Sequence, residues 1–225
     1  MPALVATNPV PLRDNMDRTC HFFSDMPKNC IKTIRYIVEW SIIFFPKLLV
    51  FSQITRATSA LKHGTAIFII PECITELNTF RFKTIDWITG RTDTSGKRIS
   101  FTNFIVSFGD ATNKVCETGK WLWETKILSI SMTVASKLML VNGLSMMFGF
   151  SNRIYNTIND LQSCNYQDRT LKMWKLAKYT ALFALGTFIA IASVTSFINP
   201  VLMITYSTIS LISSFATYII EHPLE

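Results

Sequence analysis

The longest uncharged stretch of this 225-residue chain runs from Tyr179 to Ile220 and contains 42 residues. As one straight helix it would be ~63 Å long, about twice the ~30 Å hydrocarbon core of a bilayer. A water-soluble helix pair that is apolar on every face would be unstable. The stretch therefore predicts two transmembrane helices rather than one.

Asn199 and Pro200 stand near the centre of this stretch. Proline lacks an N–H and biases the preceding residue away from the helical region, so the turn is expected at this dipeptide. We predict helices over 179–198 and 201–220. The result is a transmembrane hairpin at the C-terminal end of the chain.

The charges around the hairpin predict its orientation. Lys172, Lys175 and Lys178 precede the first helix, whereas no charge lies at the turn. Because basic residues accumulate on the cytosolic side, both ends of the hairpin are expected to face the cytosol. Small residues on both helices allow close contact within the hairpin or with a second copy of the chain.

Two earlier segments are further candidates for membrane insertion. Residues 127–150 carry one charge, Lys137, and are long enough to span with tilt. We expect this lysine to lie near the bilayer midplane and to face protein or water. Residues 36–54 are also apolar but contain Glu39 and Pro46, so a half-buried or surface helix pair is an equal alternative.

An apolar row repeats at helical spacing after residue 100, with steps of three and four residues. Asp110, Lys114, Glu117 and Lys120 occupy the other face of this helix. The row predicts packing against the chain's own helices, with an intermolecular coiled coil as the alternative. It is a candidate interaction stripe, made of Phe101, Phe104, Phe108, Ala111, Val115 and Leu122.

Aromatic and basic residues interleave over residues 80–99, which we interpret as a strand or as an interfacial segment leading into a loop. Basic and aromatic side chains side by side are typical of contact with an anionic lipid surface. The candidate lipid-contacting residues are Arg81, Lys83, Trp87, Lys97 and Arg98.

The charge of the chain is uneven. All 22 Lys and Arg lie at or before Lys178, together with 13 of the 15 acidic residues. The basic residues occur singly or in pairs among apolar ones, which favours a membrane surface over nucleic acid as the partner.

The sequence contains no motif typical of catalysis or of nucleotide or metal binding. The segment from Gly90 to Arg98 resembles a P-loop, but its glycines are one residue too far apart and Arg98 replaces the Ser or Thr that binds magnesium. The five cysteines and three histidines have no zinc-binding spacing. We therefore expect no enzyme activity, no cofactor, no metal and no small-molecule substrate. Glu39, Glu72 and Lys137 remain as ionisable residues within apolar surroundings.

These features predict a mainly α-helical, multi-pass integral membrane protein with amphipathic helices. Residues 1–28 are expected to be a disordered or weakly structured leader without a Sec signal, 29–178 a helical region, and 179–220 the hairpin.

The two adjacent apolar spans in 179–220, together with the N-terminus without a Sec signal, resemble chlamydial inclusion membrane (Inc) proteins. That resemblance implies a secreted effector in the host-derived inclusion membrane. A weaker similarity is to peroxins of peroxisome proliferation, which combine amphipathic surface helices with C-terminal spans.

Two functional classes follow. The first is a non-enzymatic anchor or scaffold that recruits a protein partner, self-associates or shapes the membrane. The second is a small transporter or channel subunit.

Overall fold

The computed structural model describes residues 19, 22, 27–47, 52–90, 100–195, 197 and 199–222. It is 90% helical and has no strand in these residues, so the predicted α-helical class is confirmed. Seven helices follow one another along the described chain: α2 (Pro27–Phe44), α3 (Ser52–Ala66), α4 (Ile69–Thr89), α5 (Phe101–Glu124), α6 (Met132–Ser163), α7 (Tyr166–Thr195) and α8 (Pro200–Glu221).

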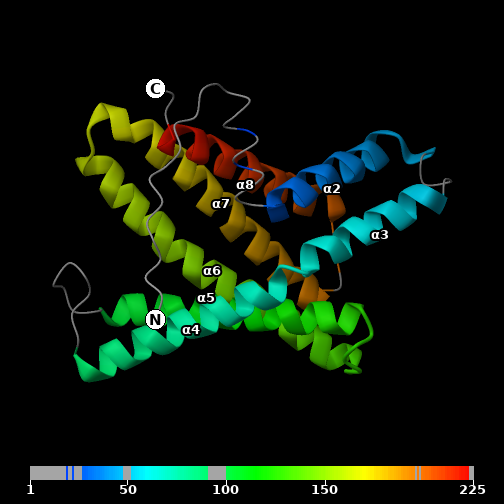
Figure 1. Cartoon of the computed structure of the whole chain (residues 1–225), viewed down its shortest axis with the longest axis horizontal. Coiled ribbons are helices and arrows are strands. Elements are labelled where there is room, and N and C mark those ends of the chain that lie inside the picture. Colours follow the sequence, from blue (N-terminus) through cyan, green and yellow to red (C-terminus); the bar gives the residue numbers. More distant parts are fainter. Residues whose placement is uncertain are drawn as a thin grey trace, which may run out of the picture.

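The helices from α4 to α8 pack mainly against their neighbours in sequence, each antiparallel to the next (Figure 1). Helix α2 then lies beside α8, where Trp40 donates a hydrogen bond to Thr208 over 3.1 Å. Lys28 of α2 reaches Glu72 of α4. The row of helices is therefore curled, and its first and last members are joined through α2.

The C-terminal hairpin is present, with bounds that differ from the prediction. Helix α7 ends at Thr195 instead of residue 198, and α8 begins at Pro200 instead of residue 201. Asn199 is the N-cap of α8, where its side chain accepts a hydrogen bond from the N–H of Leu202 (3.2 Å). Pro200 is thus the first helical residue, a position where its missing N–H would have no intrahelical partner.

The expected apolar helix at 127–150 begins later and ends later than predicted. Helix α6 starts at Met132, because Lys126 adopts a left-handed conformation (φ 60°) and Ser131 caps the helix. It then continues to Ser163. Lys137 consequently lies five residues from the helix start, or about 7.5 Å along the axis, instead of the ten residues expected from a start at 127.

The interpretation of residues 80–99 as a strand is wrong, since α4 is helical up to Thr89. The helical period places Phe80 and Trp87 on the same side, where both rings contact Phe104 of α5 (5.7 and 4.8 Å between ring centroids). Gly90 ends the helix in a left-handed conformation (φ 66°).

The segment 36–54 does not form one helix. Helix α2 ends at Phe44, and α3 starts only at Ser52. Most of the predicted leader lies outside the described residues, but Phe22 within it is buried (1% exposed). Its ring packs edge-on against Phe215 and Tyr218 of α8.

Large apolar side chains cover the outside of the bundle, whereas small and polar ones fill its contacts. On α6, the residues Val134, Val141, Leu144 and Phe148 are all more than two-fifths exposed. Ser107, Ser213 and Thr217, in contrast, are buried. This arrangement is the reverse of a water-soluble protein and suits a lipid environment.

Three helices of the described chain are long and apolar enough to cross a membrane: Met132–Ser163, Asp168–Thr195 and Pro200–Glu221. In α8 the hydroxyls of Thr205, Thr208, Ser214 and Thr217 donate to backbone carbonyls four residues earlier. Hydroxyl groups that make their hydrogen bonds within their own helix are compatible with burial in hydrocarbon.

Candidate functional site

A cavity of about 480 Å³ lies between six helices of the bundle. Its walls come from α2, α4, α5, α6, α7 and α8, so it occupies the space around which the row of helices curls. Cavities of roughly 300–1,000 Å³ are typical of ligand sites in proteins. Charged side chains line its α2 and α5 walls: Lys28, Lys32, Arg35, Asp110, Lys114, Glu117, Lys120 and Glu124.

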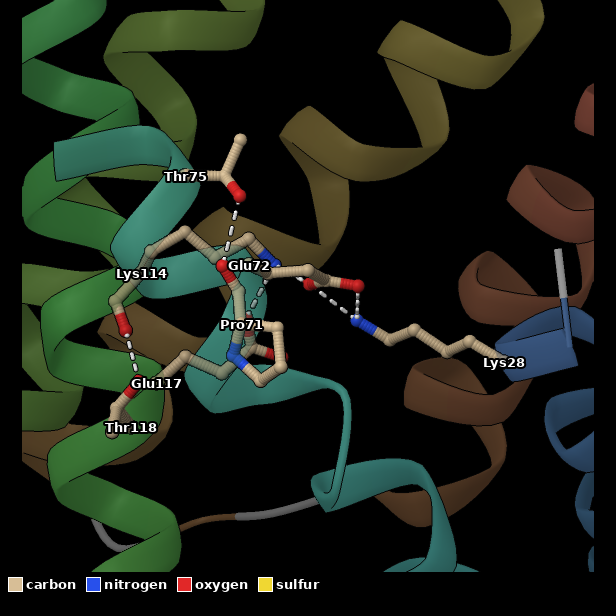
Figure 2. Close-up of polar contacts among 7 residues, drawn as sticks. All are labelled: Lys28, Pro71, Glu72, Thr75, Lys114, Glu117 and Thr118. Carbon is tan, nitrogen blue, oxygen red and sulfur yellow. Dashed lines mark hydrogen bonds and ion pairs between the residues drawn. The ribbon is translucent and has the colours of Figure 1, made fainter. Parts of the chain in front are cut away.

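A charged cluster at one edge of this cavity connects three helices (Figure 2). The carboxylate of Glu72 on α4 accepts hydrogen bonds from Lys28 of α2 (2.6 Å) and Lys114 of α5 (2.7 Å). Lys114 also donates to Glu117 one turn along α5 (2.8 Å). Glu72 is therefore the residue that ties α2 to the α4–α5 pair.

The pKa values of this cluster are set by burial and by ion pairing. Burial opposes the charged form of Glu72, but the hydrogen bonds from Lys114 and Lys28 outweigh it and hold its pKa below the usual value. The pKa of Glu117 is also below its usual value, since the attraction of Lys114 outweighs the effect of burial. For Lys114, burial is again the largest influence, yet the two carboxylates raise its pKa to about 12.

The polar face of α5, predicted only as the face opposite the apolar row, points into the cavity. Asp110 accepts a hydrogen bond from Arg153 of α6 (2.6 Å), and Lys120 lies 3.7 Å from Glu124. Helix α5 packs against both α4 and α6. Its charged residues link it to each of them, Lys114 to α4 and Asp110 to α6.

Lys32 of α2 differs from the other lining cations. No hydrogen bond or ion pair joins its ammonium to any residue of the described chain. Burial lowers its pKa to about 8, and the positive charges of Lys28 and Lys114 contribute to the decrease, whereas the carboxylates of Glu117 and Glu72 oppose it. Lys32 therefore lies half-buried among both cations and carboxylates, without a direct partner in the described chain.

The opposite wall of the cavity is apolar and hydroxyl-bearing. Leu182, Leu185 and Ile189 of α7 line it together with serines of α8. Asn142 of α6 also lines the cavity; it is 7% exposed, and its side-chain oxygen accepts no hydrogen bond from the described residues. One wall therefore suits a charged group and the other an apolar one.

Close packing of α6 and α7 supports this second wall. A Cβ added to Gly143 would lie 2.6 Å from the backbone oxygen of Gly186 and from the backbone nitrogen of Ala190. Glycine at this position is therefore required for the approach of the two backbones.

A second cavity, of about 380 Å³, lies between α2 and α8. Its lining is aromatic and aliphatic, with Trp40, Phe44 and Phe45 on the α2 side. No charged side chain of the described residues lines this second cavity.

The predicted interaction stripe on α5 is divided between two environments. Phe104 and Phe108 contact Phe80 of α4, and Ala111 is buried (4% exposed). Phe101, Phe108 and Val115 are nevertheless 61%, 52% and 45% exposed. The N-terminal part of the stripe packs on α4, and Leu122 lies half-buried in the last turn.

The candidate lipid-contacting residues lie in and after α4. Arg81 and Trp87 are exposed, and Lys83 is half-buried. Lys97 and Arg98 lie outside the described residues. Lys137, the predicted intramembrane lysine, is exposed in the second turn of α6.

Sequence reasoning missed the cavity and the role of Lys32. The available signal was the spacing: Lys28 and Lys32 on α2, like Glu72 and Glu76 on α4, lie one helical turn apart. Each pair therefore lies on one helix face, but nothing in the sequence shows that the two faces meet.

Within the described ranges, no three His, Cys, Asp or Glu side chains gather in a way that could hold a metal ion. Comparison of the chain with protein-family models, curated proteins and solved structures gives no match.

Proposed function

We propose that this chain is a non-enzymatic integral membrane protein that anchors the α4–α5 helix pair at the cytosolic membrane surface. There the pair shapes the membrane or recruits a protein partner. The observation that carries this proposal is an exposed apolar row along α4, formed by Ile70, Ile74, Leu77, Ile85 and Ile88.

The row follows helical spacing and faces away from α5. Its members are between 39% and 71% exposed, and Arg81 interrupts it at the same spacing. The other side of α4 carries Phe80 and Glu72, which contact α5. A continuous apolar face of this length on the outside of a protein is typical of a membrane or protein contact.

The charges of α4 favour an apolar mode of contact. The helix contains three acidic residues (Glu72, Glu76 and Asp86) and two basic ones (Arg81 and Lys83). The basic surplus predicted for this region comes instead from the following loop sequence, with Arg91, Lys97 and Arg98 against Asp93. Insertion of the row into a lipid surface is therefore expected to persist at high salt.

Fluorescent labelling of the full-length protein in phosphatidylcholine–phosphatidylserine vesicles tests this proposal. An environment-sensitive dye is attached to a single cysteine placed at Leu77, or at Thr75 as the matched control, since Thr75 is exposed on the same helix but lies off the apolar row. We expect blue-shifted emission at 77 and water-like emission at 75, at low and high salt. Water-like emission at both positions, with no protein partner crosslinked from position 77, would contradict the proposal.

A second candidate, a small transporter or channel subunit, is favoured by the polar cavity between the six helices. Asn142, Met146 and Phe150 of α6 line that cavity at four-residue spacing, whereas Val141 and Leu144 are exposed on the bundle surface. In a water-filled pathway, cysteines at the lining positions react with a membrane-impermeant thiol reagent and those at the surface positions do not.

The resemblance to chlamydial inclusion membrane proteins supports, as part of this proposal, a place in a host-derived membrane. Localisation of a tagged copy in its native cell tests it. A tag that remains within the producing cell would exclude that localisation.

A further inference from the structure

We propose that the cavity between the six helices is a binding site for a phosphate group, with Lys32 as its principal ligand. This inference rests on the cavity and does not depend on the membrane contact proposed for α4.

The first argument is the pairing of the lining cations. Five of the six have carboxylate partners: Lys28 with Glu72, Arg35 with Glu39, Lys114 with Glu72 and Glu117, Lys120 with Glu124, and Arg153 with Asp110. Lys32 is the sixth, and it has no such partner in the described chain. A half-buried charge without a directly bonded partner is costly, and a bound anion would reduce that cost.

The second argument is the surroundings of Lys32. Burial lowers its pKa to about 8; Lys28 and Lys114 repel its charge, whereas Glu117 and Glu72 attract it without outweighing burial. Since Glu117 and Glu72 are already paired with Lys114 and Lys28, a bound anion would gain mainly from the ammonium of Lys32. Lysine binds phosphate as a point charge, so no bidentate geometry is needed.

The third argument is the rest of the wall. Asn142 is buried with an unpartnered side-chain oxygen, so its amide can reorient toward a ligand. Ser207, Ser210 and Ser214 of α8 line the same cavity and offer hydroxyl groups. Glu76 is the one lining carboxylate without an ion pair within the described ranges, and its repulsion directs an anion to the α2 side.

The phosphate can come from solution or from a phospholipid headgroup. The apolar wall formed by α7 would accommodate the start of an acyl chain in the second case. In both cases a phosphate group binds the ammonium of Lys32. Testing inorganic phosphate and a phospholipid separately distinguishes the two sources.

The test is thermal unfolding of the full-length protein in detergent micelles. The probes are inorganic phosphate, sodium chloride at the same ionic strength, and micelles containing either dioleoyl phosphatidate or dioleoyl phosphatidylcholine. We expect a saturable rise in Tm with phosphate or with phosphatidate, and none with chloride or phosphatidylcholine. A rise with phosphatidate alone assigns the site to a lipid headgroup.

Lys32→Met is the diagnostic variant, and Lys83→Met is its matched control, because Lys83 is also half-buried but does not line the cavity. We expect Lys32→Met to weaken phosphate binding roughly tenfold or more, since a hydrogen bond to a charged group is lost. Without ligand, the same variant should be more stable than the natural protein, because a half-buried cation without a directly bonded partner has been removed. Lys83→Met should bind as the natural protein does.

Lys32→Arg and the pH dependence keep the inference testable if Lys32→Met does not fold. Arginine should retain binding, and its affinity should persist above pH 8, where Lys32 loses its proton. Absence of a saturable Tm rise with both phosphate probes, or an equal rise in Lys32→Met and Lys83→Met, would overturn the proposal.

Discussion

The α7–α8 hairpin and the α4–α5 pair are both antiparallel helix pairs joined by aromatic contacts and by an ion pair, but only the ion pair of α4–α5 is shared with a third helix. In the hairpin, Phe188 stacks on Tyr206 at 5.6 Å, and the one ion pair between its described residues, Lys175 with Glu221, lies at the open end. In the α4–α5 pair, aromatic rings stack at one end and Glu72 bonds Lys114 near the other. The ion pair of the hairpin joins its own two helices, whereas Glu72 of the α4–α5 pair also bonds Lys28 of α2.

The largest expected effect concerns the packing of the hairpin against its neighbour α6. Gly143→Leu should prevent the close approach of α6 and α7, because even a Cβ there would lie 2.6 Å from the α7 backbone. We expect a loss of about 3 kcal/mol or more, at the upper end of overpacking effects. Thermal unfolding in detergent measures it.

The control for this variant is Gly119→Ala on α5. Its added Cβ would meet only the Leu138 side chain, at 3.5 Å. An ordinary contact and a higher helix propensity should leave stability unchanged or slightly raised. If Gly143→Leu is as stable as Gly119→Ala, the close packing of α6 and α7 is not required for the fold.

The next effect concerns the ion pairs that Glu72 of the α4–α5 pair forms. Glu72→Gln removes the carboxylate shared by Lys28 and Lys114, so we expect a loss of about 2 kcal/mol, typical of hydrogen bonds to a charged group. Glu76→Gln is the control, since Glu76 lies one turn away on the same helix and has no ion pair among the described residues. Equal unfolding midpoints for the two variants would show that Glu72 does not hold α2 in place.

Acidification should reproduce part of that loss. The pKa values of Glu72 and Glu117 are below the usual 4.5 in the folded protein, so their contribution is present above pH 4.5 and disappears as pH falls through the folded values. We therefore expect Tm to fall below pH 4.5 and to fall less in Glu72→Gln. A pH series of thermal unfolding curves checks this, and parallel curves for the two proteins would exclude Glu72 as the cause.

The smallest effect concerns the hairpin turn. Asn199→Ala removes the side-chain cap of α8 and should cost about 1 kcal/mol. Pro200→Ala should change stability less, because proline at the first helical position replaces no intrahelical hydrogen bond. A greater loss in Pro200→Ala than in Asn199→Ala would indicate that the turn depends on the proline ring and not on the cap.

The sequence alone determined the helical class and the C-terminal hairpin. Both follow from local properties: the uncharged length between Lys178 and Glu221, and the effect of Pro200 on Asn199. The exact helix ends were harder to predict, since they depend on caps such as Asn199 and Ser131 and on the left-handed turn at Lys126. A period of apolar residues predicts a helix better than it predicts where the helix stops.

The cavity and its charged walls were decided only by tertiary structure. In the sequence, Asp110, Lys114 and Glu117 form the polar face of one amphipathic helix, which in isolation would face water. Their place inside the bundle depends on partners 42 to 43 residues away, such as Glu72 for Lys114 and Arg153 for Asp110. Helical periodicity fixes which residues share a face, but only the packing of all the helices fixes what that face meets.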